Sequence, residues 1–325
     1  MSVVPTAHGS VDSSRVGVTL MHEHIFVLSS EILLNYPDVW GDEDQRVAEA
    51  ARQLDALAAH GVQTIVDLTA LGQGRFIPRI QRVADRTSIN IVVATGLYTF
   101  GDVPFYFRAR GANRSAEGVD ALTDTFVRDI TSGIGDTGVR AGILKCATDA
   151  AGLTRDVERV LRAVAQAHRS TGVPISTHTH VRTRRGLDQQ RIFREEGVDL
   201  SRVVIGHSGD STDIQYLEEL IAAGSYLGMD RFGIDTILSF DERVNVVVQL
   251  CERGHAGRMV LSHDYSTFID WFPERDIPVR FPNWHYLHIP QAVVPALKQR
   301  GVTDEQIHSM LVDNPRRIFE RTGGY

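Results

Sequence analysis

Five side chains of a metal-binding type stand at the ends of short apolar, strand-like segments. They are His22 and His24 in MHEH, His178 in ISTHTH, His207 in VVIGHSG and Asp264 in MVLSHD. Imidazole nitrogen and carboxylate oxygen are ligands that suit zinc and similar first-row divalent ions. Because these segments are spread over most of the chain, only a closed fold could bring their ends together.

The pair of histidines in MHEH gives the most local geometric information. On a β-strand, residues i and i+2 face the same way, so His22 and His24 point together and Glu23 points away. Two imidazoles on one face can share one ion. An HxH pair alone is weak evidence, and the equivalent placement of the other three residues is what predicts a metal site.

A sixth apolar segment carries a charge. AGILKCA contains Lys145, where an apolar strand normally has no charged residue. A free ammonium beside two dications would be strongly repelled. A lysine that has reacted with carbon dioxide carries an anionic carbamate, whose two oxygens could bridge two ions. The alternative is an amine that reaches the rim and pairs with a carboxylate, and the surrounding histidines favour the carbamate.

The elements that must position these residues can be read from the apolar pattern. Most of the strand-like segments are apolar on both faces, as in a parallel sheet with helices on one side and a core on the other. Eight such segments are expected, at residues 16–24, 62–69, 89–96, 141–147, 174–180, 203–209, 225–231 and 259–264.

Amphipathic helical patterns separate many of these strands. The clearest are expected at residues 42–60, 155–171 and 213–223, each followed by a glycine stop. Near the C-terminus, Asn314 followed by Pro315 is typical of a helix cap with proline at the first helical position.

Repeated strand–helix alternation predicts a (β/α)₈ TIM barrel, formed by a single domain over residues 1–325. Such a barrel gathers the C-terminal ends of its strands on one rim, where the metal-binding residues would meet. A doubly wound open sheet is the rival fold. Against it, no glycine-rich phosphate loop follows the first strand.

Composition narrows the class of protein. The 325 residues carry a net charge of −7, which argues against nucleic acid as a partner. No apolar run approaches the roughly 20 residues that span a bilayer, and the first residues do not resemble a signal peptide. We therefore expect a cytoplasmic protein without a membrane partner. The two cysteines, Cys146 and Cys251, are expected to be reduced core residues.

Two connections are unusually long and rich in aromatic residues. Residues 97–125 follow the third strand and begin with Tyr98, and residues 265–288 follow the eighth strand and include Trp271. Long rim loops with clustered aromatic side chains can form a substrate channel. The alternative is that they pack on the barrel or bury a subunit contact, and their position after strands favours the channel.

The order HxH, Lys, His, His, Asp on a barrel resembles the amidohydrolase superfamily. Within it, the chain is similar to the phosphotriesterase-like lactonases over essentially its whole length. The resemblance is carried by seven short stretches in the same order: MHEHIF, TGLY, LKCATD, THTH, GHSGD, GMDRFG and LSHDY.

This resemblance implies a binuclear centre of two divalent ions, with zinc favoured and cobalt, iron or manganese possible. His22, His24 and Asp264 would hold the more buried ion, and His178 and His207 the more exposed one. Carboxylated Lys145 and a hydroxide would bridge them, and Asp264 would also handle the proton. The resemblance further places Tyr98, Arg231 and Trp271 against the substrate, and it suggests a homodimer.

The resemblance also implies a reaction. The lead hypothesis is hydrolysis of lactones, foremost N-acyl-homoserine lactones, which would quench bacterial quorum signals. Promiscuous hydrolysis of organophosphate triesters is expected at the same centre. The short connection from Arg231 to a helix near Asp241, and the long aromatic eighth connection, are the features that favour a lactonase over a dedicated phosphotriesterase.

Several alternatives stay open. A dedicated phosphotriesterase or a lactonase for other γ- or δ-lactones would use the same centre. A cyclic-amide hydrolase would need polar groups for the imide, and a non-catalytic binding protein would usually have lost ligands. His180 is taken as a second-sphere or bystander residue, and His263 as no ligand.

Overall fold

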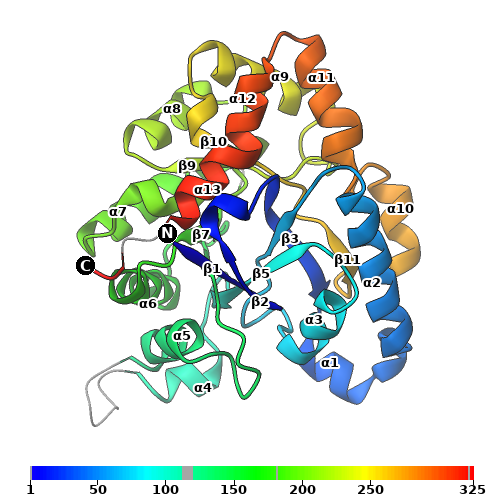
Figure 1. Ribbon diagram of the computed structural model, residues 1–325. Helices are drawn as coiled ribbons and strands as arrows, with labels where there is room; N and C mark the ends of the chain where they lie inside the picture. The colour runs from blue at the N-terminus through cyan, green and yellow to red at the C-terminus, as the bar shows by residue number, and fades with distance from the viewer. Residues whose placement is uncertain (1, 112–119, 181, 321–322) are drawn as a thin grey trace.

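The computed structural model describes residues 2–111, 120–180, 182–320 and 323–325, and it contains the barrel predicted from the sequence (Figure 1). Eight parallel strands pair in chain order, each with the next. They are β3 (Thr19–Val27), β4 (Thr64–Asp67), β5 (Asn90–Gly96), β6 (Ile143–Ala147), β7 (Ile175–His178), β8 (Val203–Ile205), β9 (Tyr226–Met229) and β10 (Met259–Leu261).

The segment after β10 returns to the first strand and closes the sheet. The His22 amide donates to Ser262 Oγ at 2.8 Å, and the Asp264 amide donates to the His22 carbonyl at 3.0 Å. A further parallel strand, β11 (Ser266–Ile269), then pairs with the outer half of β3. The predicted (β/α)₈ barrel is therefore confirmed.

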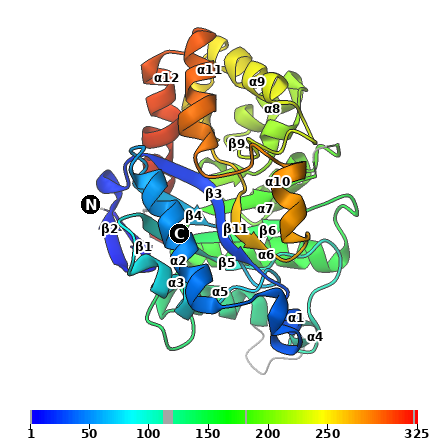
Figure 2. The same ribbon diagram turned by 90° about the vertical axis from the view of Figure 1, so that its right-hand side faces the viewer.

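Helices surround the strands, as the two perpendicular views show (Figures 1 and 2). The predicted helices at 42–60, 155–171 and 213–223 correspond to α2, α6 and α8. The main helices are α2 (Glu43–Ala58), α3 (Ile77–Ala84), α5 (Ala121–Thr131), α6 (Arg155–Thr171), α7 (Gly186–Glu195), α8 (Ile214–Ala222), α9 (Phe240–Glu252), α11 (Val294–Gln299), α12 (Asp304–His308) and α13 (Asn314–Phe319). The other helices are α1 (Ser30–Asn35), α4 (Phe105–Arg108) and α10 (Ile277–Arg280).

The helix starts follow ordinary capping chemistry. The Asp42 side chain accepts from the Gln45 amide at 2.8 Å, and the Thr154 hydroxyl accepts from the Val157 amide at 3.1 Å. These contacts satisfy backbone donors that the first helical turn leaves free.

One predicted cap is wrong. Asn314 does not cap α13, because the preceding Asp313 is already helical at φ −70° and ψ −43°. The side-chain nitrogen of Asn314, Nδ2, instead donates to the carbonyls of Ala256 and Met259, both at 2.8 Å. It therefore ties the C-terminal helix to the start of β10.

Two parts of the fold were not predicted. One is β11, the short stretch STFI inside the long aromatic connection 265–288. The other is an N-terminal hairpin of β1 (Val3–Thr6) and β2 (Gly9–Asp12). Of the other long connection, 97–125, residues 112–119 lie outside the described part of the chain.

The barrel interior is apolar at the lower end, where the N-terminal hairpin and α13 pack, and polar at the upper end, where the cavity lies. Met21, Val66, Val92 and Val260 belong to one buried cluster that also includes Val4 of the hairpin and Phe319 of α13. The pairing of β3 with β4 shifts register between Leu20 and Glu23, a bulge that lets consecutive residues of β3 face inward. This closed lower end leaves the upper rim as the place for chemistry.

Two further expectations concern the chain as a whole. Cys146 and Cys251 are both free and buried, as expected. In the part of the chain that the structure describes, no helix is both long and apolar enough to cross a bilayer.

Candidate metal centre

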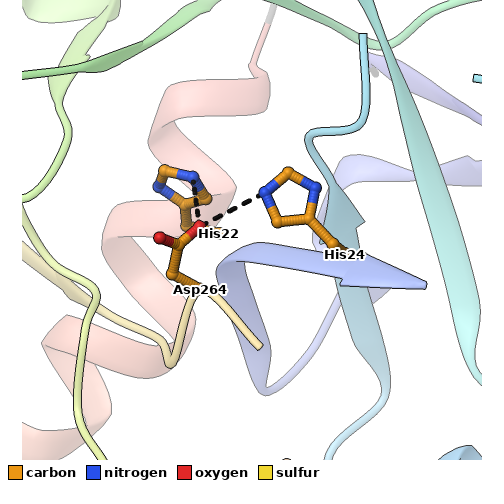
Figure 3. Close-up of side chains that lie close together, drawn as sticks. All are labelled: His22, His24 and Asp264. Carbon is orange, nitrogen blue, oxygen red and sulfur yellow. Dashed lines mark ion pairs between the residues drawn. The ribbon is translucent and has the colours of Figure 1, made fainter. Parts of the chain in front are cut away.

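Three of the predicted ligands converge from the first strand and from the loop after the eighth. His22 Nε2 and His24 Nε2 each lie 3.2 Å from Asp264 Oδ1 (Figure 3). The donor atoms of these three side chains lie within 4.8 Å of one another. Two imidazole nitrogens and one carboxylate oxygen at this spacing fit a zinc-like ion.

The other two histidines lie beside this group. His207 Nε2 is 2.9 Å from His178 Nδ1 and 3.8 Å from Asp264 Oδ2. The two oxygens of Asp264 therefore face different histidines. All five side chains come together at the rim, as their places in the sequence predicted.

His207 and Asp264 lie beyond the strands rather than in them. β8 ends at Ile205 and β10 ends at Leu261, so the predicted strands 203–209 and 259–264 are too long. Both residues adopt a left-handed backbone conformation, with φ of 59° at His207 and 54° at Asp264. Such a conformation is rare for residues other than glycine and is common at functional sites.

Lys145 lies within the same group. Its Nζ is 2.9 Å from His22 Nε2 and 3.4 Å from the carbonyl of Thr177, and the side chain is buried. Among the described residues, no carboxylate forms an ion pair with this amine, so the ion-paired lysine considered from the sequence is not what the structure shows. Burial lowers the pKa of Lys145 to about 8.

Asp230, which the sequence reasoning passed over, orients two of the histidines at once. His22 Nδ1 lies 2.7 Å from one of its oxygens and His207 Nδ1 lies 2.9 Å from the other. Although burial raises the pKa of Asp230, His207 and His22 lower it further, to well below its usual range. A carboxylate that takes the Nδ1 protons leaves both Nε2 atoms free to bind an ion.

Two more residues orient the remaining histidines. Thr69 Oγ1 lies 2.9 Å from His24 Nδ1, and Asp149 Oδ2 lies 2.8 Å from His178 Nε2. Both were missed in the sequence. A usable signal existed for the carboxylates, since Asp230 and Asp149 also follow apolar strand segments, in GMD and in CATD.

Arg231 joins the proposed ligand Asp264 to a second buried carboxylate, Asp210. Its Nε donates to Asp264 Oδ2 at 2.9 Å, and its Nη1 donates to Asp210 Oδ2 at 3.1 Å. Asp210 also pairs with Arg243, at 2.5 Å. Although burial raises the pKa of Asp264, His207, His22 and Arg231 hold it well below its usual range. Asp264 is therefore a carboxylate held between cationic and histidine partners.

A cavity of about 270 Å³ opens above these residues. Tyr98 and Trp271 lie in its wall, with their rings stacked at a centroid distance of 5.9 Å, and the Tyr98 hydroxyl lies 3.4 Å from His178 Nδ1. The rest of the wall is mostly apolar or aromatic, formed by Val27, Ile234, Ile237, Ile269, Phe272, Phe281 and Trp284, with Arg280 also lining it.

The two doubtful histidines lie elsewhere. His180 does not line the cavity, and its Nδ1 accepts from the Arg182 amide at 3.3 Å. His263 is fully buried and its Nδ1 lies 2.7 Å from Glu23 Oε1. Neither of these two histidines lines the cavity.

Fold and site together define a class of protein. Imidazole and carboxylate donors gathered at the C-terminal rim of a (β/α)₈ barrel, below a cavity, are the arrangement of a metal-dependent barrel hydrolase. The donor set, with the second nitrogen of each histidine held by Asp230, Thr69 or Asp149, fits divalent ions.

Comparison with known proteins identifies the family. The model of the phosphotriesterase family matches residues 2–319, and the chain belongs to this family, within the amidohydrolase superfamily. A phosphotriesterase homology protein of Mycobacterium tuberculosis is 67% identical over the full length of both chains. A structure described as the phosphotriesterase from Mycobacterium tuberculosis superposes with a TM-score of 0.96, covering 99% of this chain and 100% of that one.

Some more distant relatives have other names. An aryldialkylphosphatase of Saccharolobus solfataricus is 39% identical over 95% of this chain and 97% of its own length. An N-acetyltaurine hydrolase of Dictyostelium discoideum is 26% identical over 97% of each chain. Family members are metal-dependent hydrolases acting on ester bonds, which confirms the predicted class of enzyme.

Proposed function

We propose that this enzyme hydrolyses lactones, foremost N-acyl-homoserine lactones, and that organophosphate triesters are slower, promiscuous substrates. The observation that carries the proposal is the shape of the cavity, whose polar floor is the candidate metal centre and whose walls are aliphatic and aromatic. An acyl chain would be stabilised along such walls by burial of apolar surface.

The rim connections support this substrate class. The chain runs from Arg231 to the start of α9, capped by Ser239, without an inserted element between them except short turns. The connection after β10 is long and supplies Trp271, Phe281 and Trp284 to the cavity wall. A phosphate triester with short substituents would leave much of this apolar wall uncovered.

For the metal centre, we propose the arrangement that the family resemblance implies. His22, His24 and Asp264 would hold the inner ion, and His178 and His207 the outer one. Zinc is favoured, with cobalt, iron or manganese as alternatives. When bound, the two ions supply Lewis acidity that activates water and polarises a carbonyl or phosphoryl oxygen.

A carbamate on Lys145 is part of this proposal, and the geometry supports it. The Lys145 amine lies 2.9 Å from His22 Nε2, the atom that must face the inner ion. As an ammonium it would occupy that nitrogen and repel a cation. A carbamate on Lys145 would instead offer two anionic oxygens beside His22 Nε2, where they could help to hold a cation.

The chain's own residues would then act on the substrate as follows. Asp264 accepts a proton from the attacking water while Arg231 holds its second oxygen. The new C–O bond forms, the ring C–O bond breaks, and Asp264 returns the proton to the leaving alkoxide to give a hydroxy acid. Burial raises the pKa of Tyr98, so its phenol stays protonated and can donate to the substrate or to the attacking oxygen.

The test is a panel of N-acyl-homoserine lactones of graded chain length, with acid release followed by titration. The metal-reconstituted enzyme is expected to open these lactones, with kcat/KM rising as the chain lengthens along the apolar wall. Paraoxon is the comparison substrate. Rapid turnover of paraoxon with no ring opening would contradict the proposal and favour a dedicated phosphotriesterase, which the aryldialkylphosphatase relative makes the main alternative.

The remaining proposals concern the state of the protein. We propose a cytoplasmic homodimer, and exposed apolar residues near α1, such as Leu34 and Val39, are available for a subunit contact. Light scattering on the purified protein should then give about twice the chain mass of 36.0 kDa. A mass equal to one chain would contradict it.

A further inference from the structure

We propose that Glu23 is a positioning residue that holds Asp264 in place from outside the cavity. Glu23 lies between His22 and His24 in the sequence, but it points away from them and does not line the cavity. Its side chain is fully buried. The proposal concerns the metal centre itself and does not depend on which ester the enzyme hydrolyses.

Asp264 needs such support because of its backbone. Its φ of 54° lies in the left-handed region, which residues with a side chain rarely adopt. A conformation of this kind persists only where the surrounding structure over-determines it. Relaxation of this residue would swing its carboxylate away from His22 Nε2 and His24 Nε2.

Glu23 contacts the chain on both sides of Asp264. Before it, Glu23 Oε1 accepts from Ser262 Oγ at 2.9 Å and from the His263 amide at 3.0 Å. After it, Glu23 Oε2 accepts from the Tyr265 amide at 3.1 Å. The one carboxylate therefore fixes the residues that flank the left-handed position.

The His263 side chain adds a fourth hydrogen bond to Glu23, and its donor can be assigned. Its Nδ1 lies 2.7 Å from Glu23 Oε1, and its Nε2 accepts from the Ile289 amide at 2.9 Å. Because Nε2 accepts, the ring proton must be on Nδ1, where it is donated to Glu23. All four of these contacts are therefore made by donors, which the two side-chain oxygens of Glu23 accept.

The same contacts link this support to β3 and to the cavity wall. Ser262 Oγ, which donates to Glu23, also accepts from the His22 amide at 2.8 Å. The carbonyl of His263 accepts from the indole nitrogen of Trp284 at 3.0 Å, and Trp284 lines the cavity. Glu23 therefore joins the histidine strand, the Asp264 turn and the eighth connection.

This geometry leads to a specific expectation. Glutamine at position 23 keeps one oxygen for the contacts of Oε1 but places an amide donor against the Tyr265 amide. The Asp264 turn should loosen, while His178 and His207 keep their own partners. The inner ion should therefore be lost more easily than the outer one, and kcat should fall more than KM changes.

The experiment combines Glu23→Gln, Asp264→Asn and the double variant, each measured for zinc binding to the apoprotein and for hydrolysis of the ester that the wild type prefers. Glu23→Gln is expected to weaken one of two zinc equivalents about tenfold and to lower kcat about ten- to hundredfold, with KM within about twofold. In the double variant, kcat should fall no further than in Asp264→Asn alone, since Glu23 acts through Asp264.

The matched control is Asp129→Asn. Asp129 is also a buried carboxylate, held by Arg75 at 2.9 Å and by the Thr95 hydroxyl at 2.7 Å, away from the cavity. This variant should lower the melting temperature but leave zinc binding and kcat as they are. A loss of zinc binding and kcat in Asp129→Asn equal to that in Glu23→Gln would overturn the positioning role.

Two other outcomes would also overturn the positioning role of Glu23. One is unchanged zinc binding in folded Glu23→Gln, and the other is a double variant in which the losses of kcat from the two single variants multiply. If Glu23→Gln does not fold, Ser262→Ala takes its place, because it removes one donor to Glu23. That variant must show the same selective loss at smaller size, and wild-type zinc binding in it would refute the proposal. The zinc measurement needs no substrate, so it stands even if the proposed lactonase activity fails.

Discussion

The floor of the cavity, which is the candidate metal centre, differs in construction from its mouth, which is formed by partly exposed side chains such as Trp271, Ile237 and Arg280. On the floor, each histidine ligand and Asp264 is held by a further side chain, as His22 and His207 are by Asp230 and Asp264 is by Arg231. At the mouth, Trp271 and Ile237 are 45% and 41% exposed, and the Arg280 guanidinium lies 5.7 Å and 5.4 Å from the ring centroids of Phe272 and Phe281.

This difference separates chemistry from substrate choice. A floor whose groups are fixed by several hydrogen bonds has little freedom to change without losing the metal centre. A mouth made of partly exposed apolar side chains can change residue by residue at small cost. We therefore expect substitutions on the floor to lower kcat for all substrates, and substitutions at the mouth to change KM and preference.

The largest effect is expected for Asp264→Asn. The amide keeps the size of the side chain but removes the charge and the group that accepts a proton. We expect kcat to fall by about 10³-fold on lactone and phosphate triester alike. Steady-state kinetics on both substrates measures this. Retention of activity on either one would show that the two reactions do not share the floor.

The second largest effect is expected for Lys145→Ala. Removing the proposed bridge should lower the zinc content and reduce kcat by at least about 10²-fold. Short carboxylic acids should partly restore both, because a free carboxylate can take the place of the carbamate. Metal analysis with and without added acid is the measurement. Unchanged zinc content in the variant would argue against the carbamate.

Asp230→Asn should have an intermediate effect. One amide cannot accept protons from His22 Nδ1 and His207 Nδ1 at once, so one ring should lose its orientation. Zinc affinity should fall about 10- to 100-fold, while the preference between lactones of different chain length stays unchanged. A shift in chain-length preference with normal zinc affinity would contradict the proposed separation of metal binding at the floor from substrate choice at the mouth.

The smallest effect is expected at the mouth, for Trp271→Ala. Loss of the indole should raise KM about tenfold for a long-chain lactone, which corresponds to about 1.4 kcal/mol of lost apolar contact. A short-chain lactone should change little, and kcat should stay within about twofold for both. Equal effects on the two lactones would show that Trp271 supports the floor rather than the acyl chain.

The residues of the floor could be predicted from the sequence because polar and charged side chains are rare in buried strands. His22, His24 and Lys145 interrupt segments that are otherwise apolar, and parallel strands carry such residues to one rim. The barrel followed from the same segments. Asp230 and Asp149 also follow apolar strand segments, but their pairing with histidines from other strands is visible only in three dimensions.

Other features could not be read from the chain. The left-handed backbone conformations of His207 and Asp264 are one such feature. The residues that flank Asp264 are contacted by Glu23, which lies 239 residues from Ser262 and 242 from Tyr265 in the sequence. Asn314 looked like a helix cap because its local sequence fits one, but tertiary contacts with the carbonyls of Ala256 and Met259 decided its role. Long-range contacts thus overrode a local signal.

The central claim is that side chains from distant strands hold two divalent ions at the barrel rim. The most direct test is the metal-to-protein ratio of the wild-type chain, reconstituted with excess zinc and bicarbonate, freed of unbound metal by gel filtration and measured by mass spectrometry. Two equivalents of zinc per chain are predicted. A ratio of one or less under these conditions would contradict the account.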